Sequence, residues 1–206
     1  MVRFVQEQRT IVLAVLAVAV ILAAGGAAYW WYQSRQEREG SVALAEAQAS
    51  LRGEKPGAPG NPDEAMKRLR AIALQYRGTE SAEEALIRLG NLQFDNGKLD
   101  EAKATFEEYL HSYPRGRFVL MAGLGKAYAE EAKGDLQAAS QTLSDALNRR
   151  SDSPLAGEAY TALARTYEGL KKTDEAMRVY NQIVERYPQS SWAQNALDKM
   201  AALKAK

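Results

Sequence analysis

The chain has 206 residues, with 27 Lys and Arg against 26 Asp and Glu, one histidine and no cysteine. Such a balance of charge gives no indication of a nucleic-acid partner. The lack of cysteine excludes thiol catalysis and cysteine-ligated metals, and it leaves no N-terminal thiol for a lipid anchor.

An uncharged apolar segment, Ile11–Tyr32, lies near the N-terminus. Its 22 residues would span about 33 Å as a helix, enough to cross a hydrocarbon core of about 30 Å. Aromatic residues close the segment at positions 29–32, as they do in the belts at membrane interfaces. The pattern predicts a transmembrane helix over residues 10–32, preceded by a short cytoplasmic tail over residues 1–9.

A cleaved signal peptide is the alternative, because Arg3 and Arg9 form a basic start and "GAA" at Gly26–Ala28 resembles a cleavage site. The aromatic cluster favours an uncleaved anchor, since it would serve no purpose on a removed segment. Arginines stand on both sides of the span, so their count does not set the orientation. A long C-terminal domain crosses a membrane largely regardless of its charge, which favours a cytoplasmic N-terminus.

The segment after the span has two parts. Residues 33–50 are compatible with a helix apart from Gly40, whereas residues 52–62 are rich in proline and glycine and cannot be helical. Asn61, Pro62 and Asp63 then form a typical helix start. We therefore expect a helical stalk and a Pro/Gly-rich linker over residues 33–62, and a separate repeat domain over residues 63–206.

A repeat with a period of 37 residues dominates this C-terminal part. Each copy has a small residue followed four positions later by a large apolar one, which is the spacing of a buried helix face. The small residues are Ala65, Ala102, Ala139 and Ala176, and the large ones are Leu69, Phe106, Leu143 and Tyr180. A second helix in each copy is marked by Ala85, Ala122, Ala159 and Ala196, followed by Gly90, Ala127, Ala164 and Ala201. The chain is thus predicted to be all-α, with stacked helical hairpins.

The copy at Ala156–Ser190 resembles a tetratricopeptide repeat, with residues at the hallmark spacing of that family: Tyr160, Leu163, Ala164, Tyr167, Ala176, Tyr180, Ile183 and Pro188. The copy from Leu86 to Pro114 matches almost as well, with Gln93 where an aromatic is usual. The copy between them is weaker, because Lys126 and Ser151 replace the expected Leu and Pro. The first copy is half a repeat, whose first helix is missing or displaced behind the Pro/Gly-rich loop.

The resemblance implies a tetratricopeptide-like α-solenoid in which the recurring small residues set the helix spacing. Ala102, for example, is expected to pack against the Gly90 side, where a larger residue would push two helices apart. The predicted packing residues are Ala65, Gly90, Ala102, Phe106, Ala139, Ala164, Ala176 and Tyr180.

One membrane span followed by a tetratricopeptide array is similar to the ancillary subunit family of the bacterial Sec translocon. That resemblance implies a single-pass inner-membrane protein with a periplasmic domain that hands translocated proteins to chaperones or assists envelope assembly. The C-terminal copy also resembles periplasmic repeat domains of cell-division and envelope-assembly factors. A structural subunit that acts through its transmembrane helix is a further alternative, because Ala19, Ala23 and Ala27 form a small-residue stripe.

The family's ligand groove is lined by residues of the first helix of each repeat. Carried over to this chain, the predicted protein-binding residues are Ile87, Asn91, Phe94, Met121, Leu124, Tyr128 and Arg165. This mostly apolar set lacks the paired Lys and Asn that clamp a C-terminal carboxylate in some relatives, so we expect recognition of exposed apolar segments. Leu124 and Tyr128 have an alternative interpretation as core residues of a rotated helix.

Catalysis is not indicated by the sequence. The single histidine, His111, falls at a predicted helix end, where an imidazole interacts well with the helix dipole. No Ser/His/Asp arrangement, HExxH motif or phosphate-binding glycine loop occurs. We therefore predict a non-enzymatic protein that uses no cofactor, metal or small-molecule substrate, and whose partners are other proteins and the membrane.

Overall fold

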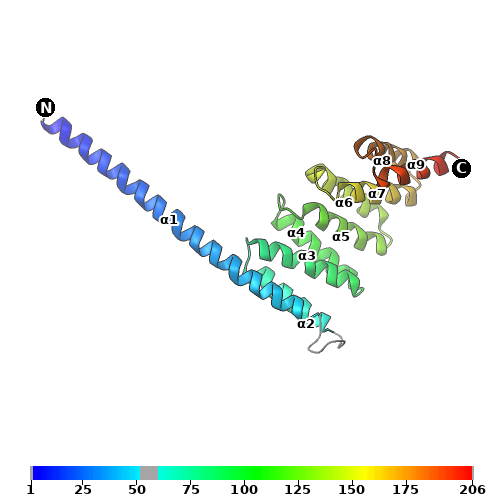
Figure 1. The fold of residues 1–206 in the computed structure, drawn as a ribbon, viewed down its shortest axis with the longest axis horizontal. Helices are drawn as coiled ribbons and strands as arrows, with labels where there is room; N and C mark the ends of the chain where they lie inside the picture. Colours follow the sequence, from blue (N-terminus) through cyan, green and yellow to red (C-terminus); the bar gives the residue numbers. More distant parts are fainter. Residues whose placement is uncertain (1, 52–59, 206) are drawn as a thin grey trace.

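The computed structural model describes residues 2–51 and 60–205, with side chains from Leu13 onward. Within these residues all regular structure is helical, and nine helices follow one another along the chain (Figure 1). Their bounds are α1 Val2–Ala49, α2 Pro62–Gln75, α3 Glu80–Asp95, α4 Leu99–Ser112, α5 Val119–Ala132, α6 Leu136–Arg150, α7 Ala156–Gly169, α8 Thr173–Arg186 and α9 Ser191–Lys204. The all-α solenoid predicted from the sequence is confirmed.

Four of the eight helix starts from α2 to α9 carry a side-chain cap. Asn61, Thr79, Asp135 and Ser190 each accept a hydrogen bond at the first turn of the following helix, which satisfies an N–H group that has no partner within the helix. The predicted start at Asn61, Pro62 and Asp63 is thus seen in α2. Most of the predicted Pro/Gly-rich loop, residues 52–59, lies outside the described residues, as do the side chains of the predicted tail.

The helices stack in sequence order as antiparallel hairpins. Helices α3, α5, α7 and α9 each contact the next one of the set, and α1 contacts α3, whereas α2, α4, α6 and α8 do not contact one another in the described part of the chain. We call the first set, with the C-terminal part of α1, the inner helices and the second set the outer helices. The inner helices therefore lie on the more closely packed side of the superhelix.

Small residues allow this close packing. A Cβ atom on Gly90 of α3 would come within 2.6 Å of the Phe106 ring, and one on Gly125 of α5 within 2.3 Å of the same ring. Phe106 itself is fully buried, as are Ala65, Ala102, Ala164 and Ala176, and Ala139 and Tyr180 are each 1% exposed. The ring of Phe106 therefore joins two successive inner helices, because both offer glycine where it lies.

The first hairpin takes its inner helix from the end of α1. Leu44 is 6% exposed and Ala47 is fully buried, and both belong to the core that α2 and α3 share. A Cβ atom on Gly40 would come within 2.9 Å of Ser81, so glycine is needed where α1 crosses the start of α3. The helix that the sequence left missing or displaced is thus supplied from before the loop, and part of the predicted stalk packs inside the array.

The apolar part of α1 extends away from the array (Figure 1). Its candidate membrane span lies within Leu13–Ala49, with a mean hydropathy of 2.1 over the most apolar stretch and none of that stretch buried. Trp30 and Trp31 are 72% and 57% exposed at its end. Length and composition suit a membrane crossing, while the array begins within one or two helical turns of Tyr32.

Candidate functional site: the inner face of the array

The face formed by α3, α5 and α7 carries the predicted binding residues, but it does not expose all of them. Ile87 is 3% exposed and Leu124 is 5% exposed, and each lies in a hydrophobic core cluster. A partner on the surface cannot reach these two side chains, so we assign them to packing. Leu124 is thus a core residue, as in the alternative interpretation of the sequence.

Asn91 is exposed near the start of the array, beside a pocket of about 200 Å³ between α1, α2 and α3. The pocket is lined by Ala47, Gln48, Leu51, Leu69, Arg88, Asn91, Leu92 and Asp95. With its amide oxygen turned toward α3, Gln48 accepts hydrogen bonds from Arg88 at 3.2 Å. Arg88 also donates to Glu84 at 2.8 Å, so a charged side chain bridges α1 and the face of α3.

A second cluster joins α5 to α7. The hydroxyl of Tyr128 donates to Glu158 Oε1 at 2.9 Å, while Arg165 donates to both oxygens of Glu131, at 3.1 and 2.7 Å. The guanidinium of Arg165 lies 5.8 Å from the centre of the Tyr128 ring, within range of a cation–π interaction. This cluster presents an aromatic ring together with a paired cation and carboxylates.

The cluster shifts the ionisation of its members. Burial, followed by the hydrogen bond to Glu158, raises the pKa of the Tyr128 hydroxyl above its ordinary value, so it stays a neutral donor. The hydrogen bonds to Glu131 raise the pKa of Arg165. Tyr128 therefore stays neutral and Arg165 stays positively charged over the physiological pH range.

Met121 and Phe94 are partly buried and pack against the core, leaving part of each side chain at the surface. The exposed inner face is accordingly more polar than the sequence indicated, because two of its predicted apolar members turn inward and ion pairs occupy the remaining surface. Such a face suits a partner segment that combines apolar side chains with charges.

A buried polar cluster that was not predicted from the sequence lies between α5 and α6. Glu130 is 1% exposed, and its Oε1 atom lies 3.1 Å from Lys126 Nζ and 3.3 Å from Lys103 Nζ. Thr142 donates to Glu130 Oε2 at 2.8 Å. The carboxylate is thus held by groups from three helices, the arrangement that a buried charge requires.

An equivalent pair occurs one repeat earlier, where Thr105 donates to Gln93 at 2.7 Å and Arg70 donates to Thr105 at 3.1 Å. The pairs Gln93 with Thr105 and Glu130 with Thr142 are each separated by 12 residues and repeat at 37. A polar residue at the usual aromatic position, together with a threonine at a fixed interval, was the signal that could have found them.

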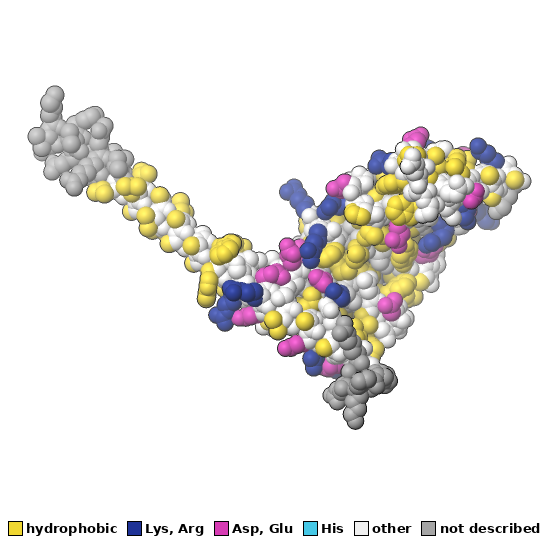
Figure 2. All heavy atoms as spheres, in the orientation of Figure 1, with side chains coloured by type: hydrophobic (Ala, Val, Ile, Leu, Met, Phe, Trp, Pro, Cys, Tyr) yellow, Lys and Arg dark blue, Asp and Glu magenta, His cyan; other side chains and the backbone are white. Residues whose placement is uncertain are grey.

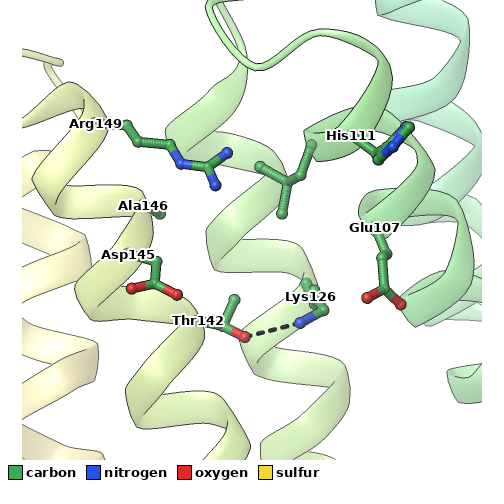
Figure 3. Close-up of a pocket in the computed structure, with 8 residues that line it drawn as sticks. Glu107, His111, Lys126, Thr142, Asp145, Ala146 and Arg149 are labelled. Atoms are coloured by element: carbon green, nitrogen blue, oxygen red, sulfur yellow. Dashed lines mark hydrogen bonds between the residues drawn. The ribbon is translucent and has the colours of Figure 1, made fainter.

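His111 lines a pocket of about 290 Å³ on the outer side, between α4 and α6 and over α5 (Figure 3). The pocket also includes Glu107, Leu110, Lys126, Thr142, Asp145, Ala146 and Arg149. Lys126 donates to Thr142 at 3.0 Å, as the dashed line in Figure 3 marks, and Lys126 also faces the buried Glu130. The polar side chains Lys126 and Thr142 in this pocket therefore take part in the packing of α5 on α6. Within the described residues no cluster of three metal-ligating side chains is present.

Residues 45–206 match the family model YfiO, described as outer membrane lipoprotein. No curated protein matches the chain. Among solved structures, a tetratricopeptide repeat protein from Parabacteroides merdae has a TM-score of 0.64 at 17% identity, over 82% of this chain and 61% of that one. MamA from residue 41 onward, from Desulfovibrio magneticus, has a TM-score of 0.58 at 18% identity, over 81% and 89%.

The first tetratricopeptide domain of Spaghetti (RPAP3), bound to the HSP90 peptide SRMEEVD, has a TM-score of 0.51 at 22% identity, over 60% of this chain and 94% of that one. At these identities the likenesses establish the tetratricopeptide fold. Proteins of this fold and family are interaction scaffolds, which agrees with the expectation that the chain is not an enzyme.

Proposed function

This chain belongs to the YfiO family, and from that premise we propose that it is a membrane-anchored scaffold whose inner face binds other proteins on the periplasmic side of the inner membrane. The observation that carries the proposal is the surface cluster of Tyr128, Glu131, Glu158 and Arg165, which spans two repeats and offers a ring and charges to a partner.

The anchor is proposed to be the apolar part of α1. The family match begins at residue 45 and so does not include this segment, and the family's description as lipoproteins does not supply an anchor here because the chain has no cysteine to carry a lipid. The unburied apolar helix with its terminal Trp and Tyr residues supports a membrane-spanning role. The proposed segments are a tail over residues 1–9 and a span over residues 10–32, with the array outside the cytoplasm.

The proposed clients are protein segments that expose apolar side chains next to charges, as during handover of translocated proteins or assembly of envelope complexes. The RPAP3 domain holds a peptide in its solved structure, which supports peptide recognition by this fold. Because the predicted face lacks the paired Lys and Asn of a carboxylate clamp, we propose that internal segments are recognised and not chain termini.

A photo-crosslinking amino acid placed at Asn91 tests the inner face in cells. Asn91 is exposed on α3, and Gln182 is an exposed control position on the outer helix α8. We expect Asn91 to yield discrete crosslinked products, identified by mass spectrometry, and Gln182 to yield none of them. The same products from both positions would contradict a binding role for the inner face.

Arg165→Ala should weaken the capture, because it removes the side chain that faces Tyr128 and Glu131. Arg178→Ala is the matched control, since the Arg178 side chain is 73% exposed on α8 and its ion pair with Glu175 is long, at 3.9 Å. If the partner is a membrane protein that binds α1 through its small-residue stripe, both variants will retain it and the span alone will co-purify it. That result would favour the structural-subunit alternative.

A further inference from the structure

The loops of the array form two opposite edges. The near edge holds the loops from an outer to the next inner helix, α2–α3, α4–α5, α6–α7 and α8–α9. The far edge holds the loops α3–α4, α5–α6 and α7–α8, together with the C-terminal end of α1 and the start of α2. The near edge lies next to the end of the apolar segment of α1. The side chain of Gln33, one residue after that segment, donates to the carbonyl of Gly78 in the α2–α3 loop at 2.8 Å.

The junction between α1 and the near edge is held by several contacts. The carboxylate of Glu37 accepts from the backbone N–H groups of Glu80 at 2.7 Å and Ser81 at 3.1 Å, at the start of α3. This geometry combines a helix cap with a favourable charge at the helix N-terminus. Gly40 packs against Ser81 immediately beyond it. The direction of α1 therefore sets the direction of the whole array.

The two edges differ in charge. Counting each loop with the three helical residues on either side, the near edge carries six arginines and four carboxylates, a net charge of +2. The described residues of the far edge carry four lysines and eleven carboxylates, a net charge of −7. The arginines of the near edge are Arg77, Arg115, Arg117, Arg149, Arg150 and Arg186. The near edge thus carries arginines and no lysine, and the acidic excess lies on the opposite side.

Four of these arginines are exposed and form no ion pair with any described residue: Arg77, Arg115, Arg149 and Arg186. Arg149 lines the pocket beside Asp145, and Arg186 lies 5.4 Å from the centre of the Tyr160 ring, so Arg77 and Arg115 are the two most available to a ligand. Arg117 pairs with Glu80 and Arg150 with Asp152. In Figure 1 the loops that precede α3 and α5 lie on the side of the array that faces the N-terminal part of α1. Figure 2 shows dark blue side chains projecting from that side.

We propose that the near edge binds the anionic headgroups of the membrane that α1 crosses, so that the array lies against the bilayer surface. The inference rests on the proposed membrane anchor. Trp30 and Trp31 mark the interface depth on α1, and the contact between Gln33 and Gly78 places the near edge at the next turn. Arginines at that level gain from an anionic surface, while the far edge, with its carboxylates, points away from it.

The test uses the full chain reconstituted into vesicles of phosphatidylcholine alone or with phosphatidylglycerol added. Because the chain has no cysteine, a single fluorophore can be attached at Ser112→Cys on the near edge or at Asn96→Cys on the far edge, both exposed positions. Lipids with a quencher on the headgroup report contact with the bilayer. We expect quenching at position 112 that requires phosphatidylglycerol and falls at high salt, with little quenching at position 96.

Arg77→Glu with Arg115→Glu should lower the ratio of docked to undocked array by about 25-fold or more, at about five-fold for each arginine lost. Lys98→Glu with Lys133→Glu on the far edge is the matched control and should leave the quenching unchanged. Equal quenching in both lipid mixtures, or none at position 112, would overturn the proposal. Flotation of the protein with both kinds of vesicle tests the anchor separately, because failure of the anchor removes flotation and failure of the edge does not.

Discussion

The hairpins α5–α6 and α7–α8 share one backbone arrangement but fill it differently. In the first, Lys126, Glu130 and Thr142 form a buried polar cluster. In the second, the residues 37 positions later are Leu163, Tyr167 and Val179, which belong to or pack against a hydrophobic core cluster. The solenoid therefore keeps its geometry through its small residues, while the layer between them can be polar or apolar provided that each polar group has a partner.

Removing one member of the polar cluster should have the largest effect. Glu130→Ala leaves Lys126 and Thr142 without their common acceptor in a buried layer, so we expect a loss of about 3–5 kcal/mol in the free energy of unfolding. Chemical denaturation followed by circular dichroism measures it. Replacing the cluster with the residues of the next repeat, as Lys126→Leu, Glu130→Tyr and Thr142→Val together, should recover most of this loss. A triple variant as unstable as Glu130→Ala would show that the two hairpins are not interchangeable.

The small residues should matter equally in every repeat if they set the spacing. Ala102→Leu and Ala176→Leu each place a larger side chain at a fully buried position, so we expect each to cost about 1–3 kcal/mol through overpacking. Ala104→Leu is the matched control, because Ala104 is exposed on α4. Thermal unfolding should show lower melting temperatures for the first two variants, and a control that melts equally early would argue against a spacing role.

The fold could be predicted from the sequence because its repeat is a property of spacing. Ala102, Phe106 and their equivalents recur at 37 residues, and a helix with that apolar stripe has to bury it against a neighbour. The inner helix of the first hairpin could not be placed, because the Pro/Gly-rich segment separates it from α2 and its pattern merges with the membrane segment in α1.

The candidate site was less predictable, because the exposure of a helix face depends on its rotation against its neighbours. Ile87 and Leu124 stand at positions that line a groove in the family, yet here they turn into the core. The sequence also gives no direct indication of contacts between repeats, such as that of Arg165 with Glu131, since the two residues lie 34 positions apart. The charge difference between the two edges becomes visible when the loops are sorted by the side on which they lie.

Two buried tyrosines allow a comparison of hairpins in alkaline solution. The hydroxyl of Tyr180 donates to Glu168, and that of Tyr109 donates to Glu83 at 2.6 Å. Burial and then these hydrogen bonds raise the pKa of each hydroxyl. A raised folded-state pKa means that the stabilisation is fully present below the unfolded pKa of about 10 and is lost as the pH rises above it.

We therefore expect Tyr180→Phe and Tyr109→Phe each to cost about 1–2 kcal/mol at neutral pH. The difference from the parent protein should shrink above a pH of about 10, where the unfolded parent ionises. Urea denaturation at neutral and alkaline pH measures both quantities. A difference that stays constant with pH would show that these hydroxyls do not have raised pKa values.

The smallest expected effect concerns the turn between the inner and the outer helix in the hairpins α3–α4, α5–α6 and α7–α8. Gly97, Gly134 and Lys171 occupy equivalent positions, and all three have positive φ, with 73°, 82° and 58° respectively. Glycine adopts this conformation without steric cost, whereas a lysine is strained there. Lys171→Gly should therefore stabilise the folded protein by about 0.5–1 kcal/mol through relief of the backbone strain. The greater conformational entropy of glycine in the unfolded chain offsets part of this gain. Gly134→Lys is the reciprocal change in the neighbouring hairpin and should destabilise it by a similar amount. Thermal unfolding of both variants measures these changes. A lower melting temperature for Lys171→Gly would mean that the contacts of the lysine side chain stabilise the protein by more than the strained backbone at position 171 destabilises it.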